Sequence, residues 1–259
     1  ISMVDGLGRT VSLPGPVKRI VSLAPSNTEL VYALGTGRLL VGRDDFSNYP
    51  DVVKNLPSVG GTTGYDLEAI VNLKPDIVLA AGINTAEQVK SMEDLGLNVF
   101  YMANPTDFNG LYQNLAIIGV LTDRRPRASD LIRTLDARVQ YVQEKLKDLT
   151  DEQKPIVFYE LDATDPSKPW TGGPGSFVDL LINMAGGLNA GGGLSDAWGQ
   201  LSQEDLIAAN PDYIFLGDAN YGVTPESLAA RPGWDQLKAV KENHVLTIND
   251  DMVSRPTPR

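Results

Sequence analysis

Two periods of apolar residues alternate along most of the chain. A short run rich in β-branched residues at 18–24 is followed by Ser-Asn-Thr-Glu at 26–29, which predicts a capping box with Ser26 as N-cap and Glu29 at N3. Similar strand patterns lie at 39–42, 77–80, 99–101 and 156–161, and helical patterns at 67–73, 85–95 and 176–185. Short strands alternating with helices predict an α/β fold with parallel sheets.

A different pattern occupies residues 126–149, where apolar residues recur every three or four positions with charges between them. It predicts one helix roughly 35 Å long, which suits a rigid connection between two lobes better than a flexible linker does. We therefore expect an N-terminal lobe at 1–122, a connecting helix at 123–150 and a C-terminal lobe at 151–259 that lacks its last helix.

The chain contains an internal repeat. Each copy begins with a capping residue, carries Glu68 or Glu204 two positions later, and has Pro-Asp seven positions after the Glu, at Pro75 and Pro211, before an apolar strand. The repeat predicts two similar α/β lobes. The helix dipole alone explains either carboxylate, with about 0.3–1 kcal/mol of stabilisation. Their matched placement also suggests two acidic points that contact basic residues of a symmetric partner.

Composition limits the classes of partner. Hydrophobic residues make up 42% and charged residues 21% of the 259 positions, as in ordinary globular proteins. The net charge of −11 argues against nucleic acid or an anionic membrane as the main partner. There is no cysteine, which excludes disulfides and thiolate metal sites and is compatible with an oxidising compartment. No apolar run approaches the ~18 residues of a membrane span, and we expect an export signal to have been removed.

Catalytic motifs are absent from the sequence: it has no nucleotide-binding glycine motif, zinc-protease motif or nucleophile elbow. Its one histidine, His244, is interpreted as a strand-edge residue, with a metal or haem ligand as the alternative, and no triad partner is recognisable. The glycine-rich loop at 171–176 precedes a helix and suits either an anionic ligand group or a close backbone approach or tight turn. We predict a binding protein without catalytic activity. A Rossmann-like enzyme is the less favoured alternative.

Three aromatic residues fall in predicted loops: Tyr49, Trp170 and Trp198. Loops at the carboxyl edges of parallel strands are where α/β proteins bind ligands, and flat side chains suit a flat ligand. The alternative is that each aromatic covers the edge of its own lobe's core.

Four segments carry a family resemblance, at 19–29, 41–50, 67–78 and 201–204. Together they resemble the helical-backbone class of periplasmic solute-binding proteins, and within it the cobalamin (vitamin B12) binding proteins of ABC importers. The resemblance extends over nearly the whole chain. It implies two Rossmann-like lobes joined by one long helix, with a ligand cleft between the lobes. Iron-siderophore and haem binding proteins share this scaffold and remain the alternative.

The resemblance also implies roles for individual residues. Tyr49 is expected to stack on the corrinoid, Trp170 and Trp198 to line the binding site, and Asp251 and Arg255 to supply polar groups near its edge. Cobalamin is then a transported ligand, with no resident cofactor or metal.

The same resemblance implies how the protein works in the cell. Glu68 and Glu204 match carboxylates that contact arginines of the importer's transmembrane subunits. The protein is expected to be a monomer outside the cytoplasm, either free in the periplasm or lipid-anchored at the cell surface. A haem-binding relative would need an iron ligand, for which Tyr49 or Tyr65 could serve.

Overall fold

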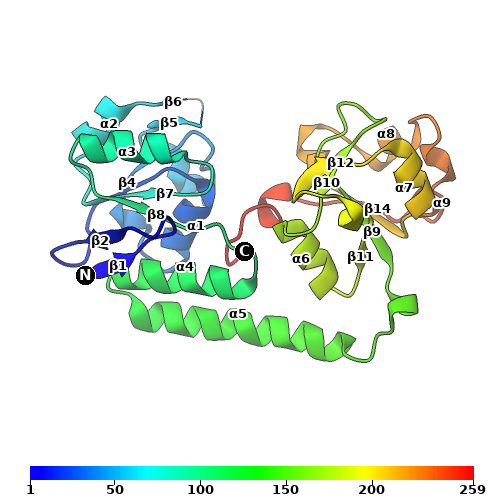
Figure 1. The fold of residues 1–259 in the computed structure, drawn as a ribbon, viewed down its shortest axis with the longest axis horizontal. Helices are drawn as coiled ribbons and strands as arrows, with labels where there is room; N and C mark the ends of the chain where they lie inside the picture. Colours follow the sequence, from blue (N-terminus) through cyan, green and yellow to red (C-terminus); the bar gives the residue numbers. More distant parts are fainter. Residues whose placement is uncertain (63) are drawn as a thin grey trace. The chain divides into compact units, whose positions relative to one another are not determined.

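The computed structural model describes residues 1–62 and 64–259 and divides into two compact α/β units (Figure 1). The first unit comprises residues 1–136 and 256–259, and the second comprises residues 137–255. The boundary falls inside helix α5 (Arg125–Leu146). The expected division treated 123–150 as a separate connecting segment and assigned residues 256–259 to the C-terminal lobe. The last four residues instead pack with the first unit.

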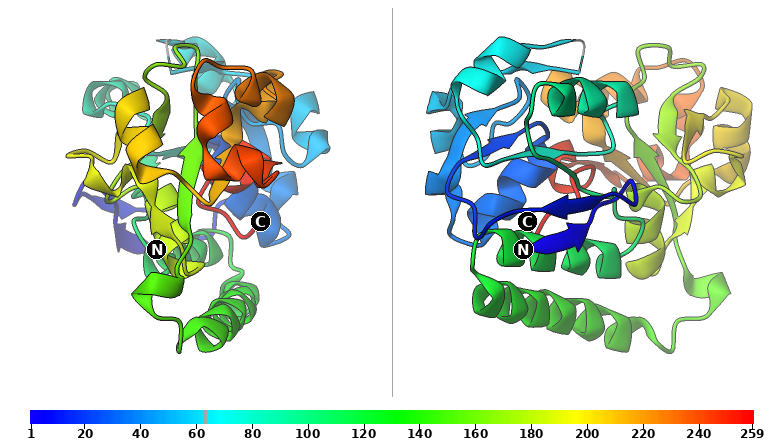
Figure 2. Two further views of the ribbon diagram at one scale, coloured as in Figure 1. Left: turned by 90° about the vertical axis from the view of Figure 1, so that its right-hand side faces the viewer. Right: turned by 60° about the vertical axis from the view of Figure 1, so that its left-hand side comes forward.

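The first unit is built on a parallel four-stranded sheet in the order β4-β3-β7-β8. The strands are β4 (Leu40–Arg43), β3 (Ile20–Ser22), β7 (Ile77–Ala80) and β8 (Val99–Tyr101). The helices are α1 (Pro25–Ala33), α2 (Leu67–Asn72), α3 (Ala86–Asp94) and α4 (Phe108–Leu121). One core contains apolar residues of α1 and α4, and a second contains residues of α2 and α3. Successive strand residues enter opposite cores, as pleating requires, so the helices cover both faces of the sheet (Figure 2).

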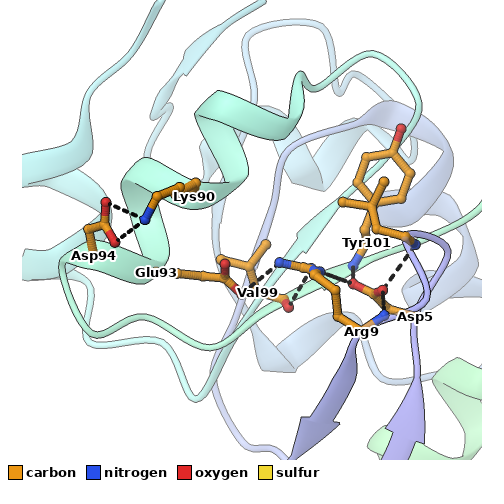
Figure 3. A network of polar contacts seen from close by, with 8 residues as sticks. Asp5, Arg9, Lys90, Glu93, Asp94, Val99 and Tyr101 are labelled. Carbon is orange, nitrogen blue, oxygen red and sulfur yellow. Dashed lines mark hydrogen bonds and ion pairs between the residues drawn. The ribbon is translucent and has the colours of Figure 1, made fainter.

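An N-terminal pair of antiparallel strands, β1 (Ser2–Val4) and β2 (Thr10–Ser12), is attached to this sheet by a polar network (Figure 3). Asp5, whose side chain is fully buried, pairs with Arg9 and accepts a 3.2 Å hydrogen bond from the backbone N–H of Tyr101 in β8. Arg9 also pairs with Glu93 of α3 at 2.6 Å. Burial opposes ionisation of Asp5, but the side-chain bond from Arg9 and three backbone N–H donors outweigh it and lower its pKa.

The second unit repeats the sheet topology, with strand order β11-β9-β13-β14, all parallel. The strands are β11 (Leu188–Asn189), β9 (Ile156–Glu160), β13 (Tyr213–Leu216) and β14 (Val245–Thr247). The helices are α6 (Phe177–Met184), α7 (Gln203–Ala209), α8 (Pro225–Ala229) and α9 (Lys238–Lys241). Residues of α6 pack in one core and residues of α7, α8 and α9 in another.

Two short antiparallel ribbons complete the strands. The first unit contains β5 (Gly60–Gly61) paired with β6 (Gly64–Tyr65). The second contains β10 (Trp170–Gly172) paired with β12 (Trp198–Gln200). The structure thus confirms the predicted α/β class and the two similar parallel sheets.

The repeat seen in the sequence is also a repeat of structure. The residue before each Pro-Asp pair has left-handed backbone, with φ of 46° at Lys74 and 43° at Asn210. Each Asp then binds the neighbouring central strand. The Asp76 carboxylate accepts from the N–H of Arg19 at 2.9 Å, and that of Asp212 accepts from the N–H of Ile156 at 2.7 Å. The Pro-Asp pair therefore fixes how each helix returns to its sheet.

One predicted helix start is wrong. Ser26 was expected to cap α1 with Glu29 at N3, but the N-cap is Ala24, without a side-chain cap bond, and Pro25 occupies the first turn. Proline suits the first helical position because its fixed φ is already helical and its missing N–H is not needed there. The helix can therefore begin before Ser26, and the Glu29 carboxylate bonds elsewhere.

Helix α5 matches the predicted long amphipathic segment at 126–149. Leu131, Ile132 and Leu135 pack against the core of the first unit, whereas Tyr141 and Val142 are 64% and 43% exposed. In the described part of the chain, no helix combines the length and apolar character that crossing a membrane requires.

Candidate functional site

A buried hydroxyl network holds the loop that carries Tyr49. This loop follows β4, and in it the Ser47 hydroxyl donates to Asp44 at 2.5 Å and lies 2.9 Å from the hydroxyl of Thr28 in α1. Thr28 in turn donates to Ser22 at the end of β3 at 2.8 Å. Burial raises the pKa of Asp44 against the opposing bond from Ser47. The network fixes Tyr49 near the carboxyl ends of β3 and β4.

Tyr49 is 45% exposed and contacts the last residue of the chain. The guanidinium of Arg259 lies 4.1 Å from the centre of the Tyr49 ring, within cation–π range. Arg259 is held there by two bonds to Glu29 in α1, from Nε at 2.9 Å and from Nη2 at 2.8 Å. Glu29 also accepts from the Thr257 hydroxyl at 3.0 Å. This buried carboxylate thus anchors residues 256–259 beside the predicted ligand-stacking tyrosine.

In the second unit, the two predicted ligand-binding tryptophans lie on one antiparallel ribbon. Trp170 pairs with Gln200, and Trp198 pairs with Gly172. Residues directly opposite each other share a face, as do residues two apart on one strand. Trp170 and Trp198 therefore project from the same face of the ribbon, and they are 41% and 42% exposed. A pair of exposed indoles on one surface can cover a flat ligand.

Trp170 also lines a cavity of about 700 Å³ within the second unit. The other lining residues are Leu161, Asp162, Ala163, Thr164, Gly217, Asp218, Tyr221, Val223 and Asp250. Most follow the carboxyl ends of β9 and β13 directly, the edge at which parallel sheets bind ligands. Trp198 is not among the lining residues, although it shares the ribbon face with Trp170.

Behind this cavity lies a buried charge cluster. Glu160, the last residue of β9, is fully buried and bonded by Arg231 through both terminal nitrogens, at 2.6 and 2.9 Å. Arg231 also stacks over Trp234 at 4.6 Å. Burial raises the pKa of Glu160 to about 7; Arg231 opposes the shift and the neighbouring Asp218 adds to it. Burial likewise raises the pKa of Asp218.

Asp251 and Arg255 bind each other at 2.6 Å, with partly buried side chains. The adjacent Asp250 lines the cavity and accepts from the Tyr159 hydroxyl at 2.5 Å. Of the two residues predicted to supply polar groups, Asp251 therefore follows the lining residue Asp250 directly, and neither Asp251 nor Arg255 is itself among the lining residues.

The two predicted docking carboxylates occupy equivalent positions in the two units. Glu68 lies in the first turn of α2, capped by Asp66, and Glu204 in the first turn of α7, capped by Ser202. Both are exposed, and neither has a hydrogen-bond or ion-pair partner among the described residues.

Two possible metal ligands have structural partners. His244 precedes β14, stacks on Tyr213 at 4.6 Å, and has Nδ1 3.1 Å from the carbonyl of Asp212, as expected of a strand-edge histidine. The Tyr65 hydroxyl donates to Leu23 O at 3.2 Å and accepts from Asn84 at 2.7 Å, and burial raises its pKa. Residues 1–62 and 64–259 contain no group of three or more His, Asp or Glu positioned to hold a metal.

Sequence reasoning missed Glu160, Asp162, Asp218 and Asp250 as site residues. The signal was present for three of them, since Glu160 ends one apolar strand, Asp162 comes two residues after it, and Asp218 comes two residues after another strand. Ligands of open α/β sheets bind beyond the carboxyl ends of the strands, so polar residues at these positions are candidates.

Comparison with known proteins agrees with this architecture. The family model described as periplasmic binding protein matches residues 20–252. The chain is 31% identical over 262 residues to the ABC transporter substrate-binding lipoprotein YvrC of Bacillus subtilis, covering 100% of this chain and 81% of that one. It is 29% identical over 252 residues to the vitamin B12-binding protein of Vibrio campbellii, covering 95% and 86%.

A similar solved structure is the periplasmic haem-binding protein RhuT of Roseiflexus sp. RS-1, with a TM-score of 0.81, 26% identity and 93% of each chain covered. The family match spans most of the sequence and both four-stranded sheets. The chain therefore belongs to the periplasmic binding protein family, the non-catalytic substrate-binding proteins of ABC transporters.

Proposed function

We propose that this protein binds cobalamin or a related corrinoid and delivers it to the permease of an ABC importer. The main support is that the exposed indoles of Trp170 and Trp198 lie on one face of a ribbon. Trp170 also lines a cavity of about 700 Å³. Tyr49 is an exposed aromatic residue of the first unit. The vitamin B12-binding relative at 29% identity supports the choice of ligand.

The alternative ligand is an iron-siderophore or haem. The haem-binding protein with a similar structure supports it. A tyrosine ligand to iron has to give up its proton, and the Tyr65 hydroxyl is committed to Leu23 and Asn84 with a raised pKa. This leaves Tyr49 as the tyrosine of the pair for that role.

Calorimetric titration tests the ligand. We expect saturable one-to-one binding of cyanocobalamin, with haemin and a ferric hydroxamate as comparison ligands. Replacing Tyr49, Trp170 or Trp198 by Ala should weaken binding by at least roughly fivefold each, because an aromatic contact contributes about 1 kcal/mol beyond its buried area. Tyr141→Ala is the matched control, since Tyr141 is a 64% exposed aromatic on α5. Tight binding of haemin without binding of cyanocobalamin would contradict the corrinoid proposal and support haem as the ligand.

Docking to the permease is proposed to use Glu68 and Glu204. Support comes from their exposure, their lack of partners in the described chain and their equivalent positions in two similar units. Two matched acidic points fit basic residues on the two halves of a symmetric membrane partner.

A double variant tests docking separately from ligand binding. Glu68→Ala combined with Glu204→Ala should bind ligand normally and lose most ligand uptake in reconstituted vesicles. The matched control is Glu87→Ala with Glu226→Ala, which removes first-turn glutamates from α3 and α8. Full uptake by the Glu68/Glu204 variant would contradict the docking proposal without affecting the ligand proposal.

The site of action is proposed to be the outer face of a cytoplasmic membrane. Membership of the periplasmic binding protein family supports this placement, and the lipoprotein relative supports a lipid anchor for the native protein. Fractionation of cells before and after globomycin treatment distinguishes an anchored from a free form.

A further inference from the structure

The wall of the cavity in the second unit is acidic. Among the residues that the structure describes, its lining includes three carboxylates, Asp162, Asp218 and Asp250, and no lysine, arginine or histidine. An anionic ligand group placed there would lose hydration without gaining a cation.

One oxygen atom of these carboxylates lacks a hydrogen-bond donor, although the Asp218 carboxylate that carries it also bonds Glu160 and the backbone of Ala163. Asp218 is only 5% exposed, and its Oδ1 atom is buried without a hydrogen-bond partner among the described residues. A buried acceptor left without a donor is costly, so such groups in folded proteins usually have a functional explanation. A ligand N–H at this wall would supply the missing donor.

The nearby cation is unavailable for an anionic ligand. Arg231 lies close enough to lower the pKa of Asp218, but both of its terminal nitrogens bond the buried carboxylate of Glu160. Its guanidinium is also stacked on Trp234. Arg231 therefore bonds Glu160 directly and compensates the charge of Asp218 only in part.

The other two carboxylates are positioned by local bonds. Asp162 accepts from the backbone N–H of Thr164 at 2.6 Å, a bond that lowers its pKa and keeps it ionised. Asp250 accepts from the Tyr159 hydroxyl at 2.5 Å and from the Ser254 hydroxyl at 2.8 Å. These contacts are made within the protein and still leave the cavity with acceptors and negative charge.

We propose that this cavity selects a ligand portion that is neutral or cationic and rich in N–H donors, and that Asp218 accepts a hydrogen bond from it. The inference rests on the proposed function and narrows it. A corrinoid carries several primary amides, which are donors of this kind, whereas haem carries carboxylates. The charge of the wall therefore favours corrinoids, or cationic hydroxamate chelates, over haem and over oxyanions.

The test compares cyanocobalamin with its monocarboxylic acid derivatives, in each of which one amide is replaced by a carboxylate. We expect at least one derivative to bind the wild-type protein at least ~10-fold more weakly than cyanocobalamin, because a new anion meets the acidic wall. Asp218→Asn should reduce this discrimination to about threefold or less. Asp162→Asn, at an exposed position, should reduce it as well and does not disturb a buried residue.

Asp148→Asn is the matched control, because it removes one negative charge from an exposed position outside the cavity lining. The proposed selectivity would be wrong if all derivatives bound with equal affinity, or if the discrimination survived both Asp218→Asn and Asp162→Asn. Either result would leave the proposed binding of cobalamin intact.

If cyanocobalamin does not bind, the corrinoid proposal fails, and haemin is compared with its dimethyl ester. Preference for the ester would support the acidic selection, and preference for haemin would overturn it.

Discussion

The two units share a topology and differ in the chemistry at the carboxyl edges of their sheets. Their pairing registers align Leu23 of the first unit with Glu160 of the second, and Gly82 with Asp218. At these two positions the first unit has a buried leucine and an exposed glycine, where the second has two buried carboxylates. The buried carboxylate at this edge of the first unit is Asp44, which follows β4. A repeated fold fixes where a ligand edge lies, and individual substitutions on that edge decide what it binds.

Both units nevertheless contain a buried carboxylate whose arginine partner is distant in the sequence, in addition to the local Asp5–Arg9 pair of the first unit. In the second unit, Glu160 pairs with Arg231 across 71 positions of sequence, and in the first, Glu29 pairs with Arg259 across 230. The Glu160–Arg231 pair lies beside Asp218 in the cavity lining of the second unit, whereas the Glu29–Arg259 pair holds residues 256–259 beside Tyr49. Breaking each pair separates the two roles.

The largest effect is expected from Arg231→Ala. At pH 8 the variant should lose about 3–5 kcal/mol of unfolding free energy, because it leaves the Glu160 carboxylate buried without a cation. Urea denaturation followed by tryptophan fluorescence measures this. The double variant Glu160→Leu with Arg231→Leu imitates Leu23 in the first unit and should recover most of the loss. A change below 1 kcal/mol in Arg231→Ala would show that the buried pair is not important for stability.

A smaller effect is expected from pH. The pKa of Glu160 is raised to about 7 in the folded protein, so the folded state holds its proton more tightly than the unfolded chain does. This stabilisation is fully present below the unfolded pKa of about 4.3 and is lost as pH rises through about 7, a change of roughly 3–4 kcal/mol.

Glu160→Gln removes this titration. The stability of the wild-type protein relative to Glu160→Gln should therefore fall between pH 5 and pH 8, as measured by urea denaturation at each pH. Asp5 has a lowered pKa and contributes the opposite slope, with stability lost as pH falls below about 4. A constant difference between the two proteins across pH 5–8 would contradict the assignment to Glu160.

The smallest effect is expected from Arg259→Ala, at about 2 kcal/mol, because Glu29 loses two charge-assisted bonds and keeps the Thr257 hydroxyl as a donor. Thermal and urea denaturation measure the loss. Arg259→Lys should recover part of the lost stability, since lysine restores the positive charge but cannot bond the carboxylate in the bidentate geometry of arginine. If Arg259→Ala is neutral for stability and for ligand affinity, residues 256–259 are not held in solution as the structure places them.

Much of the fold could be predicted from the sequence. The strand and helix periods, the Pro-Asp repeat and the Asp66 and Ser202 caps are local signals, and each corresponds to an observed element. The start of α1 was misjudged because two local signals competed there, and proline at the first helical position prevailed over Ser26. The acidic residues that line the cavity of the second unit were not predicted, and the ligand-binding roles of Tyr49, Trp170 and Trp198 stay predictions.

The sequence by itself determined the elements, their order and the duplicated α/β plan, because these depend on periodicity and on residues a few positions apart. The tertiary structure decided which carboxylates are buried, which arginine pairs with each, and that Trp170 and Trp198 share a ribbon face. Those contacts join residues 28 to 230 positions apart. Whether a charged side chain is buried, and which residue it pairs with, depends on how distant parts of the chain pack together. A local pattern of residue types does not determine that packing.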